Sequence, residues 1–170
     1  MTRSLRQPCL ALSAVAMLAL AGNAHAVGSA DVHFVNPQAY TDAGFGPVEN
    51  ERTQRRLAAR LERLAQQLPD GQVLQVQVQD IDLAGETGTL ALHEHRRVLG
   101  RLPDRPRLTL SFQLLAGDQV LKQGQDVLTA DMDYLTRVGT LRPGTPLEFE
   151  GRLLDEWFAQ RVAPVAGHAP

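Results

Sequence analysis

Apolar residues follow two different periods along this chain. Between Val48 and Leu68 they recur every three or four residues, at Leu57, Leu61, Leu64 and Leu68, which is one stripe of an α-helix. Elsewhere they alternate with polar residues, which is the period of a β-strand. The strands predicted in this way lie at residues 31–35, 72–83, from 90 onward, 108–114 and 120–129.

A second helix is predicted from Thr145, with Pro146 at its first position, to about Val162. Its apolar face includes Trp157 and Phe158, which we expect in the core. The resulting order, β-α-β-β-β-β-α, predicts an α+β two-layer sandwich, in which a mostly antiparallel sheet of four to five strands carries both helices on one face. The first two strands would be parallel if they are neighbours, because a helix connects them by a crossover.

The N-terminal segment has the pattern of a secretory signal peptide. Arg3 and Arg6 precede an uncharged apolar run at residues 9–22, and Ala24-His25-Ala26 offers small residues where a signal peptidase cleaves. The run is shorter than the roughly 20 residues that span a bilayer as a helix. We therefore expect cleavage after Ala26, a single domain at residues 27–163, a disordered tail at 164–170, and a periplasmic or secreted protein.

Cleavage would change the composition in two ways. Two arginines and no acidic residue would be lost, so 15 basic and 19 acidic residues would remain, with a formal charge of −4. The only cysteine, Cys9, would also be removed, which excludes disulfides and thiol chemistry in the mature chain. Mild acidity and export both argue against a nucleic-acid partner.

Two aspartates interrupt the alternation in QVQVQDIDLAG, residues 75–85. Counted by two, Asp80 and Asp82 would share the core face with Val78, where unpaired carboxylates are very costly. A one-residue bulge near Gln79 would turn both aspartates outward and return Ile81 to the core. The two interpretations are a bulge or strand end with solvated acids, and a cation or polar-ligand site.

Asp131 and Asp133 repeat the same acid-apolar-acid pattern, and four such carboxylates can hold a hard cation such as calcium. In a simple meander, however, the two pairs would lie at opposite edges of the sheet, on the order of 25 Å apart. Only a crossed topology would bring them together. Without a crossed topology, Asp31 at the start of the first strand is the better neighbour for the pair at 131 and 133.

His93 and His95 are the other candidate metal ligands, since residues two apart on a strand face the same way. Leu90 and Leu92 mark the buried face of this strand, so both imidazoles would point to the wetter side beside Arg97. A solvated strand face is the alternative interpretation.

The first helix carries five arginines off its leucine stripe, at Arg52, Arg55, Arg56, Arg60 and Arg63. Guanidinium groups suit phosphate and carboxylate, so this face, with Arg52 and Arg56 as candidates, can recognise an anionic envelope component. A solvated helix face is the simpler alternative. Tyr40 and Tyr134 are candidates for lining a groove near the FVNP loop.

Five segments together resemble a known family: FVNPxxYTD (residues 34–42), DIDLAG (80–85), PRLTLSFQLL (106–115), DMDYL (131–135) and EFEGRLLDEWFAQR (148–161). The chain is similar in these segments to exported bacterial proteins grouped as domain of unknown function 3016. The resemblance implies an envelope location, and it supplies no catalytic residue.

The sequence lacks the common catalytic motifs, among them Gly-x-Ser-x-Gly, Ser-x-x-Lys and His-Glu-x-x-His. The main hypothesis is therefore a non-enzymatic periplasmic module, with no cofactor, that binds an envelope protein or an anionic envelope component. The alternative is a metal-binding protein or metal-dependent hydrolase that uses His93 and His95 or the aspartates at 80, 82, 131 and 133. A purely structural role is a third possibility.

Overall fold

The computed structural model describes residues 27–88, 96–98, 105–131 and 147–163. The main sheet has four strands in the order β1-β2-β5-β6. β1 (Ser29–Phe34) pairs in parallel with β2 (Gln72–Asp82), and β5 (Arg107–Ala116) and β6 (Gln119–Thr129) continue the sheet in antiparallel fashion. β3 (Glu86–Gly88) and β4 (Arg96–Val98) form a separate two-stranded sheet.

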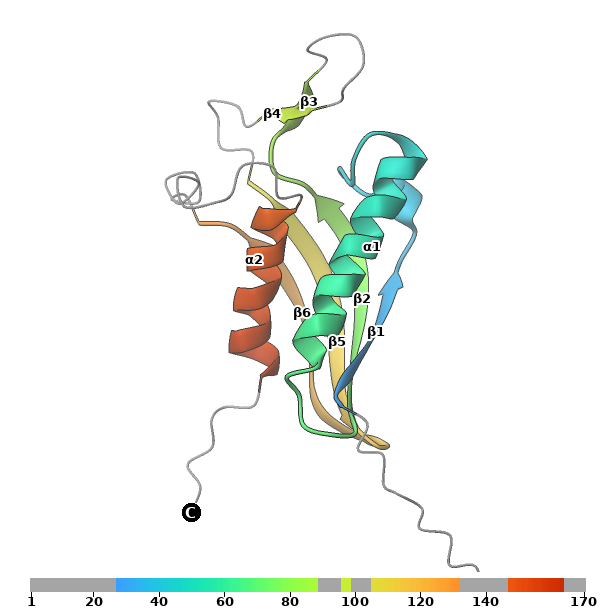
Figure 1. The fold of residues 1–170 in the computed structure, drawn as a ribbon, viewed down its shortest axis with the longest axis vertical. Helices are drawn as coiled ribbons and strands as arrows, with labels where there is room; N and C mark the ends of the chain where they lie inside the picture. The colour runs from blue at the N-terminus through green and yellow to red at the C-terminus, as the bar shows by residue number, and fades with distance from the viewer. Residues whose placement is uncertain (1–26, 89–95, 99–104, 132–146, 164–170) are drawn as a thin grey trace, which may run out of the picture.

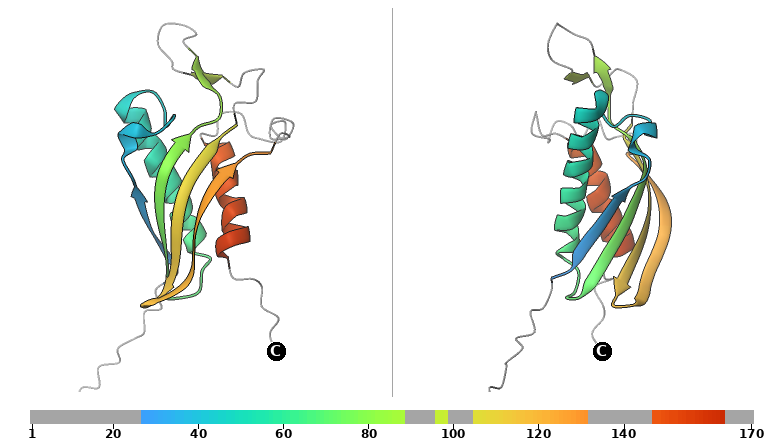
Figure 2. Two further views of the ribbon diagram at one scale, coloured as in Figure 1. Left: turned by 180° about the vertical axis from the view of Figure 1, so that it is seen from behind. Right: turned by 90° about the vertical axis from the view of Figure 1, so that its right-hand side faces the viewer.

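Both helices lie on one face of the main sheet (Figure 1; Figure 2, right). α1 (Gly46–Ala65) connects β1 to β2, and a short 3-10 turn, η1 (Pro37–Ala39), precedes it. α2 (Glu148–Trp157) continues into one π-helical turn, η3 (Phe158–Val162). The predicted α+β class, the two helices on one sheet face and the parallel first pair of strands are confirmed. None of the described helices is long and apolar enough to span a bilayer.

The core lies between the helices and the sheet, where the predicted apolar stripes meet. Leu61 of α1, Leu74 of β2 and Leu110 of β5 have no exposed surface. Burial of one such side chain stabilises the fold by about 1.5–3 kcal/mol. Trp157 and Phe158 are 3% and 2% exposed, which confirms their predicted place in the core.

Gly28, just before β1, lies against the end of α1. A Cβ atom at this position would be 2.4 Å from the carbonyl oxygen of Ala65 and 2.6 Å from Cβ of Leu68. No side chain fits at that distance, so a glycine here lets the first strand run directly beneath the last turn of the helix.

α2 begins at Glu148, two residues after the predicted first position, Pro146. Its N-cap is Leu147, which has a left-handed backbone (φ 59°) and makes no side-chain capping bond. The first turn is closed by the backbone N–H of Gly151, which donates to the carbonyl of Leu147 at 2.8 Å. The predicted cap at Thr145, like the predicted strand at residues 90–92, lies outside the described residues.

The predicted bulge in β2 is confirmed. Val78 pairs with Leu110 and Asp80 with Thr109, so Gln79 is the extra residue. Beyond it Ile81 is buried, and Asp80 and Asp82 are partly exposed on the other face.

The expected strand geometry was wrong in one respect. β2 pairs directly with β5, because β3 and β4 leave the main sheet, so β2 and β6 run the same way with only β5 between them. Their final residues therefore lie at the same end of the sheet, two strand spacings or about 10 Å apart. The expectation for Asp31 was also wrong, since it pairs with Gln75 near the start of the opposite edge strand, far from Asp131.

Candidate functional site

The segment after η1 is held against the bulged end of β2 by polar contacts that we call the β2 clamp, formed by Tyr40, Thr41, Asp42, Asp80 and Glu150. Thr41 donates its backbone N–H to Oδ1 of Asp80 at 2.8 Å and its hydroxyl to Oδ2 at 2.9 Å. Both carboxylate oxygens of Asp80 are therefore used to fix this segment.

The backbone of Asp42 continues the pairing. Its N–H donates to the carbonyl of Ile81 at 2.8 Å, and its carbonyl accepts from the N–H of Leu83 at 3.0 Å. These bonds form a parallel bridge between Asp42 and Asp82. The bulge makes this possible, because it changes which backbone groups of β2 face the added segment.

Tyr40 packs against the core, and its hydroxyl donates to the carbonyl of Val78 at 3.0 Å. Burial, with a further contribution from the negative charge of Asp80, raises the pKa of Tyr40 to about 12. The phenol is thus a hydrogen-bond donor of the clamp at neutral pH.

Glu150 completes the clamp from α2. It is only 3% exposed, and its Oε1 accepts the backbone N–H of Ala84 at 2.9 Å. This contact ties the second helix to the end of β2. Sequence reasoning missed Glu150, since an acidic residue in the first turn of a helix is ordinarily solvated.

Among the candidate ligands that the structure describes, none is part of a metal site. Asp131 lies just beyond the end of β6 and is exposed. Asp133, Tyr134, His93 and His95 lie outside the described residues. Among the described residues, no group of three or more histidine, cysteine, aspartate or glutamate side chains is placed to hold a metal ion.

A second polar region lies on the outer side of the helix layer, between α1 and α2. We call it the arginine groove, and it holds a hollow of about 370 Å³. Apolar and small residues line part of it, together with Glu148 at one end. The basic residues that line it are Arg56, Arg60, Arg63 and Arg152.

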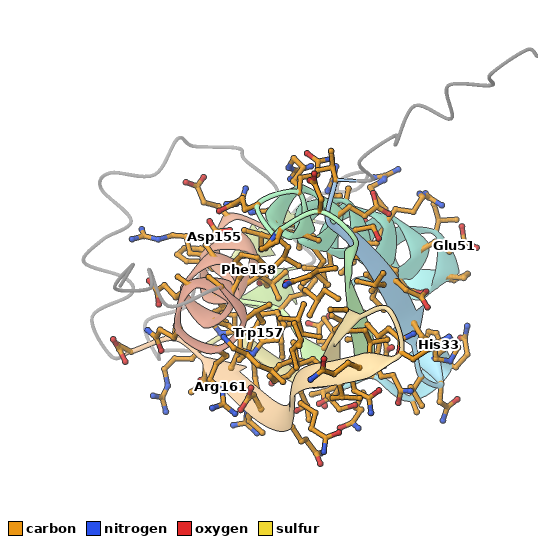
Figure 3. The ribbon with its side chains drawn as sticks, turned by 90° about the horizontal axis from the view of Figure 1, so that it is seen from below. His33, Glu51, Asp155, Trp157, Phe158 and Arg161 are labelled. Carbon is orange, nitrogen blue, oxygen red and sulfur yellow. The ribbon has the colours of Figure 1, made fainter. Side chains whose placement is uncertain are left out.

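Arg60 is the one arginine of the groove with an acidic partner in the described part of the chain. Its Nε donates to Oδ1 of Asp155 at 2.7 Å, and a second guanidinium nitrogen donates to Oδ2. This hydrogen bonding raises the pKa of Arg60 further above its usual range. Asp155 lies on the outer side of α2, whereas Arg161 lies toward β6 (Figure 3).

Arg60 and Arg63 also line a neighbouring hollow of about 400 Å³, which Asp155 lines as well. Within the described residues, Arg56, Arg63 and Arg152 form no ion pair. The groove therefore presents three guanidinium groups, each with donors available, around a partly apolar hollow.

The sequence prediction identified part of this groove. Arg56 lines it, as expected for the arginine face of the first helix. Arg52 is exposed and does not line either hollow. Arg55 pairs instead with Glu51 at 3.1 Å on the solvent side of α1. Arg152 was missed, although its place off the apolar stripe of its helix was visible in the sequence.

Comparison with known families gives one match. The family model described as "Protein of unknown function (DUF3016)" matches residues 28–160. The chain belongs to this family. No curated protein and no solved structure matches it. The resemblance stated from the sequence is thereby confirmed, and the family description names no activity.

Three of the five quoted segments meet in the structure. The first contributes Tyr40, Thr41 and Asp42 to the β2 clamp, the second contributes Asp80, and the last contributes Glu150. Segments far apart in the sequence thus meet at one end of the sheet, where their polar groups satisfy one another. We interpret the clamp as the part of the family pattern that maintains the fold.

Proposed function

We propose that this DUF3016 protein is an exported, non-enzymatic module that binds an anionic component of the cell envelope in the arginine groove. One observation carries the proposal: Arg56, Arg63 and Arg152 surround a single hollow without an ion pair among the described residues. Like charges that gather in this way repel one another, and an anion between them would relieve the repulsion.

The chemistry of the groove favours phosphate or carboxylate over other anions. Guanidinium groups present planar pairs of N–H donors that match two oxygens of either group. The hollow is also partly lined by Leu57, Ala59 and Leu147, so a ligand with an apolar part beside its charge can bury that part there. A phosphorylated amphiphile, or a phosphate ester of similar shape, meets both conditions.

Export supports the envelope as the place of binding, and it rests on the N-terminal pattern of Arg3, Arg6 and the apolar run. N-terminal sequencing of the protein recovered from the cell would test this part separately. We expect the mature chain to begin at Val27. An N-terminus at Met1 on protein recovered from the cytoplasm would contradict export and leave the groove to be tested by itself.

The metal-dependent alternative stays a prediction. Asp80 was one of its four candidate carboxylates, and both of its oxygens already accept hydrogen bonds from Thr41. We therefore assign Asp80 to the fold and the arginines to the ligand.

Binding can be tested by titrating the purified protein with tripolyphosphate and with vesicles of phosphatidylglycerol. Replacement of Arg56, Arg63 or Arg152 by glutamine should weaken binding about tenfold each, or about 1.4 kcal/mol, since hydrogen bonds to charged groups contribute on this scale. Added salt should also weaken binding, because the groups are exposed. The two probes distinguish a free phosphate from a lipid headgroup.

The matched control is Arg55→Gln, which removes a guanidinium from the same helix outside the groove. It should leave binding almost unchanged. The proposal would be wrong if neither probe binds, if the triple variant binds like the original protein, or if Arg55→Gln weakens binding as much as the groove variants do.

A further inference from the structure

The face of the sheet opposite the helices is covered by no other described element (Figure 2, right). The side chains that β2, β5 and β6 point away from the helices are rich in glutamine. We call this surface the glutamine face. It contains six exposed glutamines: Gln75, Gln77 and Gln79 of β2, Gln113 of β5, and Gln123 and Gln125 of β6.

Strand register arranges these side chains as a grid. Gln75, Gln113 and Gln123 lie opposite one another across three strands, and the next row consists of Gln77, Ser111 and Gln125. Neighbours in a row are about 4.8 Å apart, the spacing of paired strands. Gln79, the extra residue of the bulge, follows along β2, and its Oε1 accepts a hydrogen bond from Nε2 of Gln125 at 2.9 Å.

The grid has a hollow of about 490 Å³ at its centre. Its floor contains Ser111, whose side chain is short, and the backbone of Gly124. The Cβ position of Gly124 lies on the helix side, 3.1 Å from the ring of Phe112, so Ser111 is the short side chain that leaves space on this face. Phe112 contributes main chain only, because its ring packs on the helix side against Trp157, with ring centroids 5.3 Å apart. Four glutamines form the walls: Gln75, Gln77, Gln113 and Gln123.

The walls and floor of this hollow carry no charge, although 21% of the chain is charged. Exposed sheet faces ordinarily carry charged side chains, which keep a flat surface solvated and prevent association. On β1, Asp31 pairs with Gln75 and extends the first row to the rim of the grid, where it adds a charged residue outside the hollow. A charged ligand therefore finds no partner inside the hollow.

Primary amides offer two donors and an acceptor each, and a serine hydroxyl offers both functions. A ligand that matches them must itself be neutral and present many groups that donate and accept. Sugar hydroxyls have this property, and an extended sugar chain can follow the regular spacing of the rows.

We propose that the glutamine face binds a neutral sugar chain, with one sugar unit seated in the hollow above Ser111. This site is separate from the arginine groove, since the sheet and the helix layer lie between them (Figure 2, right). The inference therefore goes beyond the proposed function, and either one can fail without the other. Hydroxyl groups of this kind occur both in unsubstituted glucans and in N-acetylated glycans. The test must therefore distinguish these two classes of sugar chain.

The probes are a hexamer of β-1,4-linked glucose and a hexamer of β-1,4-linked N-acetylglucosamine, added in turn to the isotope-labelled protein. The side-chain amide signals of glutamine report on the face directly in NMR spectra. We expect signals of Gln75, Gln77, Gln113 and Gln123 to shift in a saturable way with at least one hexamer. The hexamer that binds more tightly identifies the class of glycan.

Gln77→Glu combined with Gln113→Glu removes amide donors and adds charge at nearly constant shape, and should weaken binding tenfold or more. Ser111→Tyr fills the hollow and should have a similar effect by sterics, which gives a second variant if the first does not fold. Gln66→Glu, at the end of α1, is the matched control and should bind like the original protein. The proposal is overturned if neither hexamer shifts these signals at millimolar concentration, or if folded variants of the face bind as well as the control.

Discussion

The β2 clamp and the arginine groove both gather charged side chains, but they differ in what those side chains contact. In the clamp, Asp80 and Glu150 accept hydrogen bonds from groups of the same chain. In the groove, Arg56, Arg63 and Arg152 have no ion pair within the described residues. Charges satisfied internally stabilise the fold, whereas the charges that converge in the groove are the ones we propose for a ligand from outside. Substitutions in the two regions should therefore change different measurements.

The largest effect is expected for Glu150→Leu. This change leaves the buried N–H of Ala84 without its acceptor, which costs about 1–3 kcal/mol in the free energy of unfolding. Glu150→Gln keeps an acceptor at the same position and should cost less. Urea unfolding measures both, and neither folded variant should change anion binding in the groove. If the leucine variant and the original protein are equally stable, the contact between Glu150 and Ala84 does not stabilise the clamp.

A smaller effect, on anion affinity in the groove, is expected for Asp155→Asn. Asp155 is the one internal partner of a groove arginine, so loss of its charge frees Arg60 for a ligand. The side chains of both residues are more than a third exposed, and such pairs contribute about 0–1 kcal/mol to stability. Tripolyphosphate should bind up to about fivefold more tightly, at little cost in stability. Glu51→Gln, which frees Arg55 outside the groove, is the control, and weaker binding by the Asp155 variant would contradict the assignment of the groove.

Much of the fold could be predicted because local rules decide it. The leucine stripe of α1 required a helix, and the cost of placing Asp80 on a core face required a bulge at Gln79. The parallel pairing of β1 and β2 followed from the helix that connects them. The first two inferences depend on residues close together in the sequence, and the third depends on the single helix that connects the two strands.

The rest depends on contacts between distant segments. The sequence does not reveal that β2 pairs directly with β5, because a run of strands is equally compatible with a meander. That pairing brings Gln75, Gln113 and Gln123 into one row, and the neighbouring placement of the helices brings Arg152 to Arg56. The acceptor role of Glu150 likewise exists only once α2 lies at the end of β2.

The smallest effect on stability at neutral pH is expected from the titration of Tyr40. It changes stability only at high pH, and it tests the clamp without involving the groove. The pKa of Tyr40 is raised from 10.0 to about 12, first by burial and then by the charge of Asp80. A pKa raised on folding means that the native state holds this proton more tightly than the unfolded state does. The associated stability is therefore fully present below about pH 10 and is lost as the pH rises toward 12.

The difference in unfolding free energy between the original protein and Tyr40→Phe isolates this group from the other tyrosine and from the single lysine, Lys122. It should be constant up to about pH 10 and should shift against the original protein between pH 10 and 12. Asp80→Asn should lower the pKa of Tyr40, as followed by phenolate absorbance, because it removes the second cause of the shift. Arg56→Gln, made in the groove, should leave that titration unchanged. A Tyr40 that titrates at its usual value in the folded protein would mean that its side chain is not buried beside Asp80, and Tyr40 would then not belong to the clamp.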